Sequence, residues 1–139
     1  MRQSQHEIAI PTRGKGLIEF TDEARSFVRE SGVGTGLLTI FCCHTSASLL
    51  IQENADRDVQ RDLMAFFRRL VPDGDPLYVH SVEGPDDMPA HVKAALTQTS
   101  ISIPVSNGKL MLGPWQGIYL FEHRNAPHDR RVVLHVAGV

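Results

Sequence analysis

Hydrophobic residues along this chain recur with two different periods, which predict strands in some segments and helices in others. Residues 36–42 form an apolar run with the length of a buried strand, and residues 100–105 alternate strictly between apolar and polar. The pair Asn107-Gly108 is the favoured two-residue turn of a hairpin, so a return strand is expected over 109–112. The same criteria predict further strands over 7–10, 16–20, 77–80, 117–122 and 131–137.

Three segments have the three- and four-residue spacing of amphipathic helices. The first covers 22–31 with Thr21 as its expected cap, and the longest covers about 55–70 with Asn54 as its cap. A third helix is expected over about 89–98. The resulting order is strand, strand, helix, strand, strand, helix, short strand, helix and four strands. It predicts an α+β fold: a compact single domain over 1–139 with a mainly antiparallel β-sheet sandwich and about three helices.

The composition narrows the class of partner. The 139 residues are 42% hydrophobic, which is enough for one sizeable core. A net charge of −2 argues against a nucleic-acid partner, because such proteins concentrate positive charge on one face. Cys42 and Cys43 are adjacent in a predicted strand and should point to opposite faces, which fits the reducing cytoplasm. No apolar run approaches ~20 residues, so neither membrane insertion nor a signal peptide is expected.

Polar residues directly after the strand at 36–42 are the first candidates for a functional site. His44, Thr45 and Ser46 place one imidazole and two hydroxyls at the end of that strand. The hydroxyls suit contact with a phosphate, or a nucleophile with an adjacent base, while a turn stabilised by hydroxyl-to-backbone bonds is the plainer alternative. Glu53 precedes the expected cap of the long helix, so a role in the helix dipole explains it less well.

Two further histidines, His80 and His91, flank the acidic loop 83–87. Carboxylates of this kind suit Mg²⁺, whereas imidazoles suit Zn²⁺ or other transition metals. The spacing of the histidines is not a local metal motif, so a metal site requires the fold to gather them. A solvated loop that caps the third helix is the alternative.

The last third of the chain adds one aromatic and several charged candidates. Trp115, beside Gln116, either closes the end of the core or forms the wall of a pocket for a flat ring. The charged residues that follow either hold phosphate oxygens through arginine or form a solvated hairpin loop. They are Glu122, His123, Arg124, His128, Arg130 and Arg131.

Taken in order, these segments resemble the YjbQ-like family of small proteins, an uncharacterised protein family often named secondary thiamine-phosphate synthase. The resemblance covers nearly the whole chain and implies a compact α+β fold, a homotrimer and a histidine-rich metal site near subunit boundaries. The segments that carry it are 44–49, Glu53-Asn54 with Asp56, 78–80, 83–91, Pro104-Val105 with Gly108, Gly113 with 115–118, and 122–124.

The resemblance also implies roles for individual residues. The imidazoles expected to bind a divalent metal are those of His44, His80 and His91, and the acids expected to act in catalysis are Glu53, Asp87 and Glu122. Substrate contacts are expected from Thr45, Ser46, Trp115, Gln116 and Arg124. The sequence departs from the family in Gly113-Pro114-Trp115, where Gly-Thr-Trp is commoner, and in a variable loop over 125–129, so His128 inherits no role.

Three functions follow from these residues. The first, which the resemblance implies, is thiamine-phosphate synthesis as a primary or a secondary activity, in which an aminopyrimidine pyrophosphate is joined to a thiazole phosphate and pyrophosphate leaves. It needs a divalent ion, cationic groups and an aromatic wall. The second is metal-dependent hydrolysis of a small phosphorylated substrate, with Glu53 or Asp87 as proton acceptor. The third is a trimeric metal- or metabolite-binding protein without catalysis.

Overall fold

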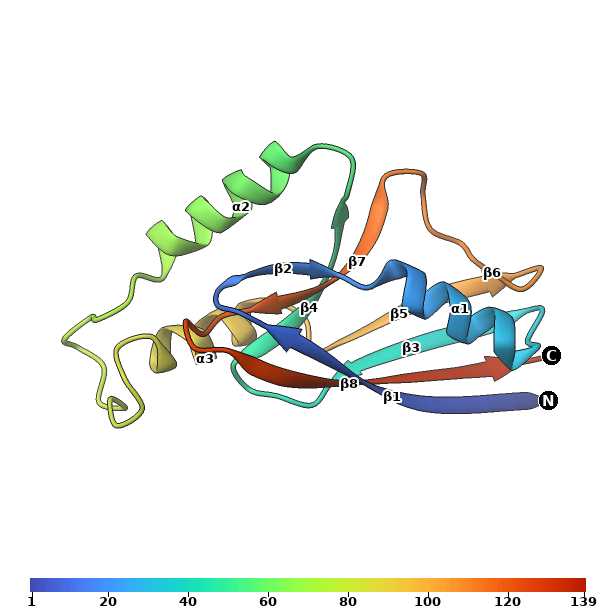
Figure 1. Ribbon diagram of the computed structural model, residues 1–139, viewed down its shortest axis with the longest axis horizontal. Helices are drawn as coiled ribbons and strands as arrows, with labels where there is room; N and C mark the ends of the chain where they lie inside the picture. Colours follow the sequence, from blue (N-terminus) through green and yellow to red (C-terminus); the bar gives the residue numbers. More distant parts are fainter.

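A computed structural model describes residues 1–139, and its larger sheet has five antiparallel strands in the order β1-β8-β3-β5-β6. These strands cover Arg2–Thr12 (β1), His128–Gly138 (β8), Gly36–Cys42 (β3), Ser100–Ser106 (β5) and Lys109–Leu110 (β6). Along β3 and β5, alternate residues such as Leu38, Ile40, Ile101 and Ile103 are buried, which gives the sheet one core-facing side. The strands cross the lower part of Figure 1, where both chain termini lie at the right-hand end.

A second sheet of three antiparallel strands has the order β2-β7-β4. The strands are β2 (Gly16–Glu19), β7 (Gln116–Glu122) and β4 (Ala47–Glu53). Leu49, Ile118 and Leu120 join the residues of the larger sheet in one hydrophobic core. The central strand β7 is buried from Gly117 onward, because the core covers one of its faces and further side chains cover the other.

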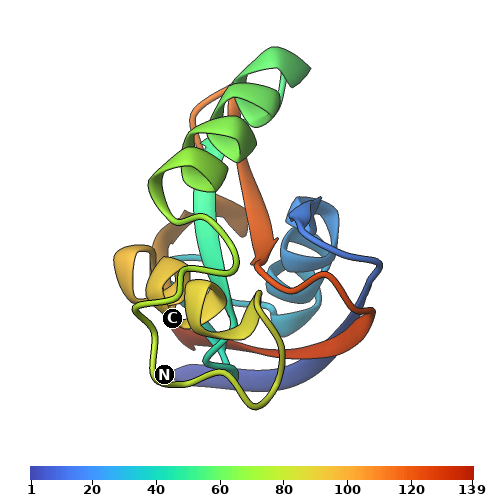
Figure 2. The same cartoon turned by 90° about the vertical axis from the view of Figure 1, so that its left-hand side faces the viewer.

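Three helices complete the fold: α1 (Thr21–Ser31), α2 (Arg57–Leu70) and α3 (Asp87–Leu96). Helix α1 packs into the core through Ala24, Phe27 and Val28. Helix α2 buries no residue and projects from the sheets, as Figures 1 and 2 show. It touches β7 through an edge-on contact between Phe67 and Phe121, with ring centroids 5.2 Å apart. No helix is long and apolar enough to cross a membrane.

These observations confirm the predicted α+β class, the mainly antiparallel pairing and the three helices. The hairpin turn is also confirmed: Asn107 and Gly108 have φ angles of 53° and 74°, and Ser106 pairs with Lys109. Cys42 is buried and Cys43 half-buried, and neither forms a disulfide.

Several element boundaries differ from the prediction. Residues 77–80 form turns and bends instead of a strand. Asp56, not Asn54, caps α2, because its carboxylate accepts a hydrogen bond of 2.9 Å from the backbone N–H of Asp58. The hydroxyl of Thr21 does not cap α1, since it accepts a hydrogen bond from the N–H of Ile118 and ties α1 to β7. Strand β1 starts at Arg2, well before the predicted residue 7, because its polar half pairs with β8.

Candidate metal centre

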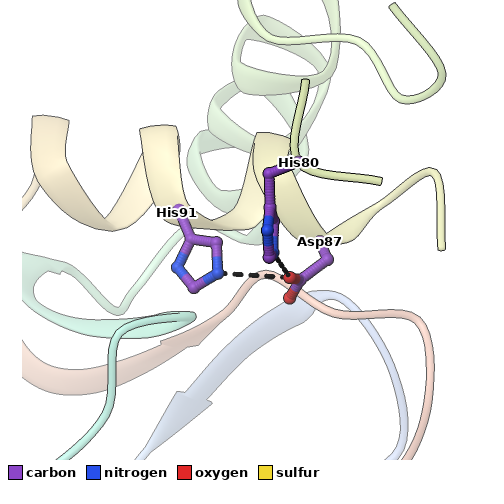
Figure 3. Close-up of side chains that lie close together, drawn as sticks. All are labelled: His80, Asp87 and His91. Carbon is purple, nitrogen blue, oxygen red and sulfur yellow. Dashed lines mark hydrogen bonds and ion pairs between the residues drawn. The ribbon is translucent and has the colours of Figure 1, made fainter. Parts of the chain in front are cut away.

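Three predicted residues, His80, Asp87 and His91, come together in one group that we call the histidine–aspartate cluster. One ligand atom from each lies within 4.8 Å of the other two. Nε2 of His80 is 2.6 Å from Oδ2 of Asp87, and Nε2 of His91 is 3.2 Å from the same oxygen. Figure 3 shows both rings directed at this carboxylate. Two imidazole nitrogens therefore converge on a single carboxylate oxygen.

Local structure explains how these residues meet. Asp87 and His91 are four residues apart and share one face of α3. His80 lies in the preceding loop, which turns back at Gly84, where φ is 106° and a side chain would be strained. Pro89 is tolerated because it lies in the first turn of α3, where its missing N–H has no intrahelical partner. The loop and the first five residues of α3 therefore supply the whole cluster.

Arg124 holds the carboxylate of Asp87 in place from the other side. Its Nη1 donates to Oδ1 of Asp87 at 2.8 Å, its Nε donates to Asp86 at 3.0 Å, and its Nη2 donates to the carbonyl of Glu83 at 2.9 Å. Burial raises the pKa of Asp87, but the hydrogen bond from His80 and the charges of His91 and Arg124 outweigh it and lower the pKa overall. Asp87 is thus a buried, ionised carboxylate with one oxygen available to the histidines.

The backbone fixes the orientation of His91. Its Nδ1 lies 3.0 Å from the carbonyl oxygen of Thr45, an acceptor, so Nδ1 carries a proton. In a neutral ring, Nε2 then presents a lone pair to the negatively charged Oδ2 of Asp87. That approach is favourable only with a cation between the two atoms, either a second proton on the ring or a metal ion. A metal-binding histidine usually donates its other ring N–H to a carbonyl or carboxylate in this way.

His44, expected as a third imidazole ligand, does not join the cluster. Its Nε2 accepts a hydrogen bond of 2.7 Å from the backbone N–H of Arg131, so the ring proton is on Nδ1 and neither nitrogen presents a free lone pair. Burial lowers the pKa of His44, and the charges of Arg130 and Arg131 lower it further. In this structure Asp87 takes the place of His44 as the third potential ligand.

Glu122, expected in catalysis, is fully buried in a different network. Its carboxylate accepts hydrogen bonds from the guanidinium of Arg130, from the hydroxyl of Thr12 at 2.6 Å, and from two backbone N–H groups. Burial raises its pKa, but the bonds from Arg130 and Thr12 lower it overall. With both oxygens saturated, Glu122 has no lone pair for a substrate proton. Its pairing with Arg130 also orients Ser46, whose hydroxyl accepts from Arg130 at 3.0 Å.

Three further predicted residues lie at or beside the far end of the smaller sheet: Glu53, Gln116 and Trp115. Glu53 pairs with Gln116 at one end of the β4–β7 ladder, while Ala47 pairs with Glu122 at the other. Six residue steps along a strand span roughly 20 Å, so Glu53 and Gln116 are remote from the cluster. Trp115, beside Gln116, is 62% exposed. The sequence therefore placed in one site residues that the fold separates into two groups.

A pocket of about 580 Å³ opens beside His91, and we call it the Phe41 pocket. His44 and Thr45 from the end of β3 form one wall, and Ala94 and Ala95 of α3 form another, with Phe41 and Cys43 alongside. The Nδ1–H of His44 has no partner in the protein. A small molecule in this pocket would touch His91 and find a hydrogen-bond donor in His44.

Sequence reasoning missed a buried polar chain behind α3. His123 is 1% exposed and its Nε2 lies 2.9 Å from the hydroxyl of Ser48, which accepts from Thr97 at 2.6 Å. Burial and the charge of Lys93 lower the pKa of His123 to about 3, so the ring is neutral. The sequence showed these residues only as members of polar segments, and no spacing marks their contact.

Comparison with known proteins connects this arrangement to one family. A family model described as UPF0047 protein YjbQ-like matches residues 6–139. The chain belongs to the YjbQ-like UPF0047 family. It is 56% identical to a UPF0047 protein of Synechocystis, over 99% of this chain and 93% of that one, and 39% identical to YjbQ of Escherichia coli O157:H7, over 96% and 97%.

Solved structures of relatives have the same fold. A YjbQ/UPF0047 family protein of Clostridium acetobutylicum, described as uncharacterised, matches with a TM-score of 0.84 and 39% identity, covering 96% of this chain and 99% of that one. A protein of unknown function from Sulfolobus solfataricus matches with a TM-score of 0.86 and 22% identity, covering 99% of both chains. At this identity the match shows a shared fold alone. Family membership therefore carries a fold but no assigned reaction.

Proposed function

We propose that this protein is a metal-dependent hydrolase of a small substrate, with phosphate esters as the substrate class. The observation that carries the proposal is the histidine–aspartate cluster, in which Nε2 of His80 and Nε2 of His91 converge on one oxygen of the ionised Asp87. Two imidazoles and one carboxylate suit Zn²⁺ or another transition metal. Three protein ligands, with a further coordination position left open, are typical of catalytic sites.

When bound, a divalent ion would lower the pKa of its water and polarise a phosphoryl oxygen. The residues of this chain hold the ion and orient the substrate. Arg124 fixes Asp87, and the carbonyl of Thr45 fixes the ring of His91. The Phe41 pocket accepts an apolar group of the substrate next to His91, and the Nδ1–H of His44 donates to a substrate oxygen.

Thiamine-phosphate synthesis, the first function expected from the family resemblance, has less support from this geometry. That reaction needs cationic groups for the departing pyrophosphate. Arg124 is occupied by Asp86 and Asp87, and Arg130 is occupied by Glu122. The aromatic wall proposed for Trp115 lies at the other end of β4 from the cluster. Hydrolysis needs only the three ligands and a pocket.

Metal content per chain tests the first part of the proposal. We expect about one transition-metal ion per chain in untagged wild-type protein, lost in His91→Ala and in Asp87→Asn. The matched control is His135→Ala, because His135 bonds to Gln5 on the larger sheet and belongs to no cluster. His44→Ala should also keep the metal. Wild-type protein that stays metal-free after supplementation with zinc would overturn the proposal.

Turnover distinguishes the three functions. The metal-loaded hydrolase should release phosphate from para-nitrophenyl phosphate and water, and His91→Ala should not. A synthase would instead release pyrophosphate only when an aminopyrimidine pyrophosphate and a thiazole phosphate are both present. A non-catalytic binding protein would be stabilised by metal without turning over either.

A further inference from the structure

We propose that a second site, at the opposite end of the molecule, binds a small phosphorylated molecule without a metal. The site is a pocket of about 730 Å³ between the end of α1 and the β5–β6 hairpin, which we call the basic pocket. Arg25 and Arg29 of α1 line one side, and Lys109 of the hairpin lines the other. In Figure 1 the elements that line it, the end of α1 and the β5–β6 hairpin, lie toward the right-hand end, near both chain termini.

The charges of the basic pocket are unbalanced. Its lining contains three cationic side chains and no acidic one. None of Arg25, Arg29 and Lys109 has a carboxylate within the 4.0 Å of an ion pair, although the chain as a whole has a net charge of −2. By contrast, Arg124 and Arg130 are each paired with carboxylates. The side chains that line the basic pocket therefore concentrate positive charge without a carboxylate side chain to balance it.

A fourth cation, Arg2, lies against Gly32 at the edge of the pocket. Gly32, which lines the pocket, has a φ of 76°, and a Cβ built there would lie 2.8 Å from Nη1 of Arg2. Arg2 therefore packs its guanidinium against backbone that carries no side chain. Arg2 also has no carboxylate within the 4.0 Å of an ion pair. The guanidinium of Arg2 therefore adds positive charge on the side of the pocket that carries Arg29. The N–H of Gly32 donates a hydrogen bond to the carbonyl of Arg29.

This arrangement costs stability unless an anion is present. Like charges four residues apart on a helix, as in Arg25 and Arg29, repel by roughly 0.2–0.5 kcal/mol. The carbonyl end of α1 favours Arg29, which is in the last turn, but its effect fades beyond that turn and does not reach Arg25. A phosphate group would accept hydrogen bonds from both guanidinium groups and relieve the repulsion.

The rest of the lining indicates what else the ligand carries. Val33, Leu110 and Leu112 give the pocket an apolar floor beside the cations. The volume lies within the range typical of small-molecule sites. A phosphate or diphosphate attached to a flat or apolar body, as in a nucleotide, matches this combination of charge and apolar surface.

The two sites are far apart. Strand β3 begins at Gly36, close to Gly34 of the basic pocket, and ends at Cys42, close to His44 of the Phe41 pocket. Its seven residues span roughly 20 Å. Binding at the basic pocket therefore requires no metal and can be measured in excess chelator, independently of the histidine–aspartate cluster.

The test is titration of metal-free protein with inorganic pyrophosphate and with adenosine diphosphate, followed by amide NMR shifts and calorimetry. We expect both to shift residues around Gly34 and Gly108, with the nucleotide binding more tightly because of the apolar floor. The double variant Arg25→Ala/Arg29→Ala and the exposed single variant Lys109→Ala should each raise the Kd at least tenfold. The matched control is Arg57→Ala/Arg61→Ala, which removes an arginine pair of the same spacing from α2.

Three results would overturn the proposal. They are an absence of binding by the wild type at millimolar ligand, an unchanged Kd in the α1 variant, and an equal loss in the α2 control, which would indicate only nonspecific charge attraction. Circular dichroism of each variant establishes that the fold is retained, and Lys109→Ala carries the test if the α1 variant unfolds.

Discussion

Arg124 and Arg130 illustrate how one residue type acquires its role from its partners. In the sequence both belong to a single charged segment that suits phosphate binding. In the structure each guanidinium is occupied by buried carboxylates: Arg124 by Asp86 and Asp87, and Arg130 by Glu122. A buried carboxylate without such a partner would be strongly destabilising. The first role of these pairs is therefore to stabilise the fold.

Removing Arg124 should weaken metal binding without removing a ligand. Arg124→Ala leaves Asp87 without the bond to Oδ1 and frees the carboxylate to rotate away from the histidines. Loss of a group that holds a metal-binding side chain in place costs roughly 10–100-fold in metal affinity, and we expect that range here. Arg124→Lys should recover part of it. Competition with a chromophoric chelator measures the affinity, and an unchanged value in Arg124→Ala would contradict the role assigned to this bond.

His123 should make the protein acid-sensitive. Its pKa is about 3 in the folded protein, mainly through burial, against about 6.5 when unfolded. Between these values the unfolded chain binds one proton more than the folded chain, so stability rises with pH. The contribution is complete above the unfolded pKa and declines by up to about 1.4 kcal/mol per pH unit below it.

The measurement is the free energy of unfolding in urea from pH 7 to pH 5. His123→Gln should flatten the decline by removing this proton. A residual slope is expected from His44, whose pKa burial also lowers. Glu122, whose pKa lies below its ordinary value, contributes only at lower pH. An equal slope in wild type and His123→Gln would show that His123 does not carry the effect.

At the scale of elements, local patterns were sufficient wherever a segment's own residues decide its structure. The hairpin at Asn107-Gly108 and the amphipathic helices could be predicted from spacing and turn chemistry. The first half of β1 is polar and could not be predicted as a strand, because its pairing with β8 is a long-range contact. Likewise, the histidine–aspartate cluster was partly predictable, since the sequence singled out all three of its members, His80 and His91 as metal ligands and Asp87 as an acid. The absence of His44 from the cluster was not predictable, because it depends on a hydrogen bond from the N–H of Arg131 in a distant strand.

Helix α2 should be the least protected element of the fold. No residue in it is buried, and Phe66 and Leu70 are about half exposed. Its contacts with β7 are the Phe67–Phe121 ring contact and a hydrogen bond of 3.0 Å from Gln60 to the hydroxyl of Tyr119. Few buried contacts mean a small free energy of local opening. Hydrogen exchange followed by mass spectrometry should show α2 exchanging well before β3 and β8, and slower exchange in α2 than in β3 would contradict this.

At the scale of the whole molecule, the candidate sites lie at the two ends of the larger sheet. The end that carries the Phe41 pocket also carries α3 and the loop with His80, while the basic pocket lies by the end of α1. The core between them is continuous across both sheets. The homotrimer implied by the family resemblance stays a prediction, which molar mass from light scattering tests directly.

Metal should stabilise the entire fold, because the histidine–aspartate cluster joins the loop before α3 to the helix and exists only in the folded state. At a free metal concentration of 100 times Kd, mass action adds about 2.7 kcal/mol to the free energy of unfolding. For a domain of this size each kilocalorie raises Tm by roughly 2–4 °C, so zinc should raise it by several degrees. His44→Ala should retain this shift, and His91→Ala should lose it, because His91 belongs to the histidine–aspartate cluster and His44 does not. The reverse pattern would place the ion at the end of β3 and make His44 the ligand after all.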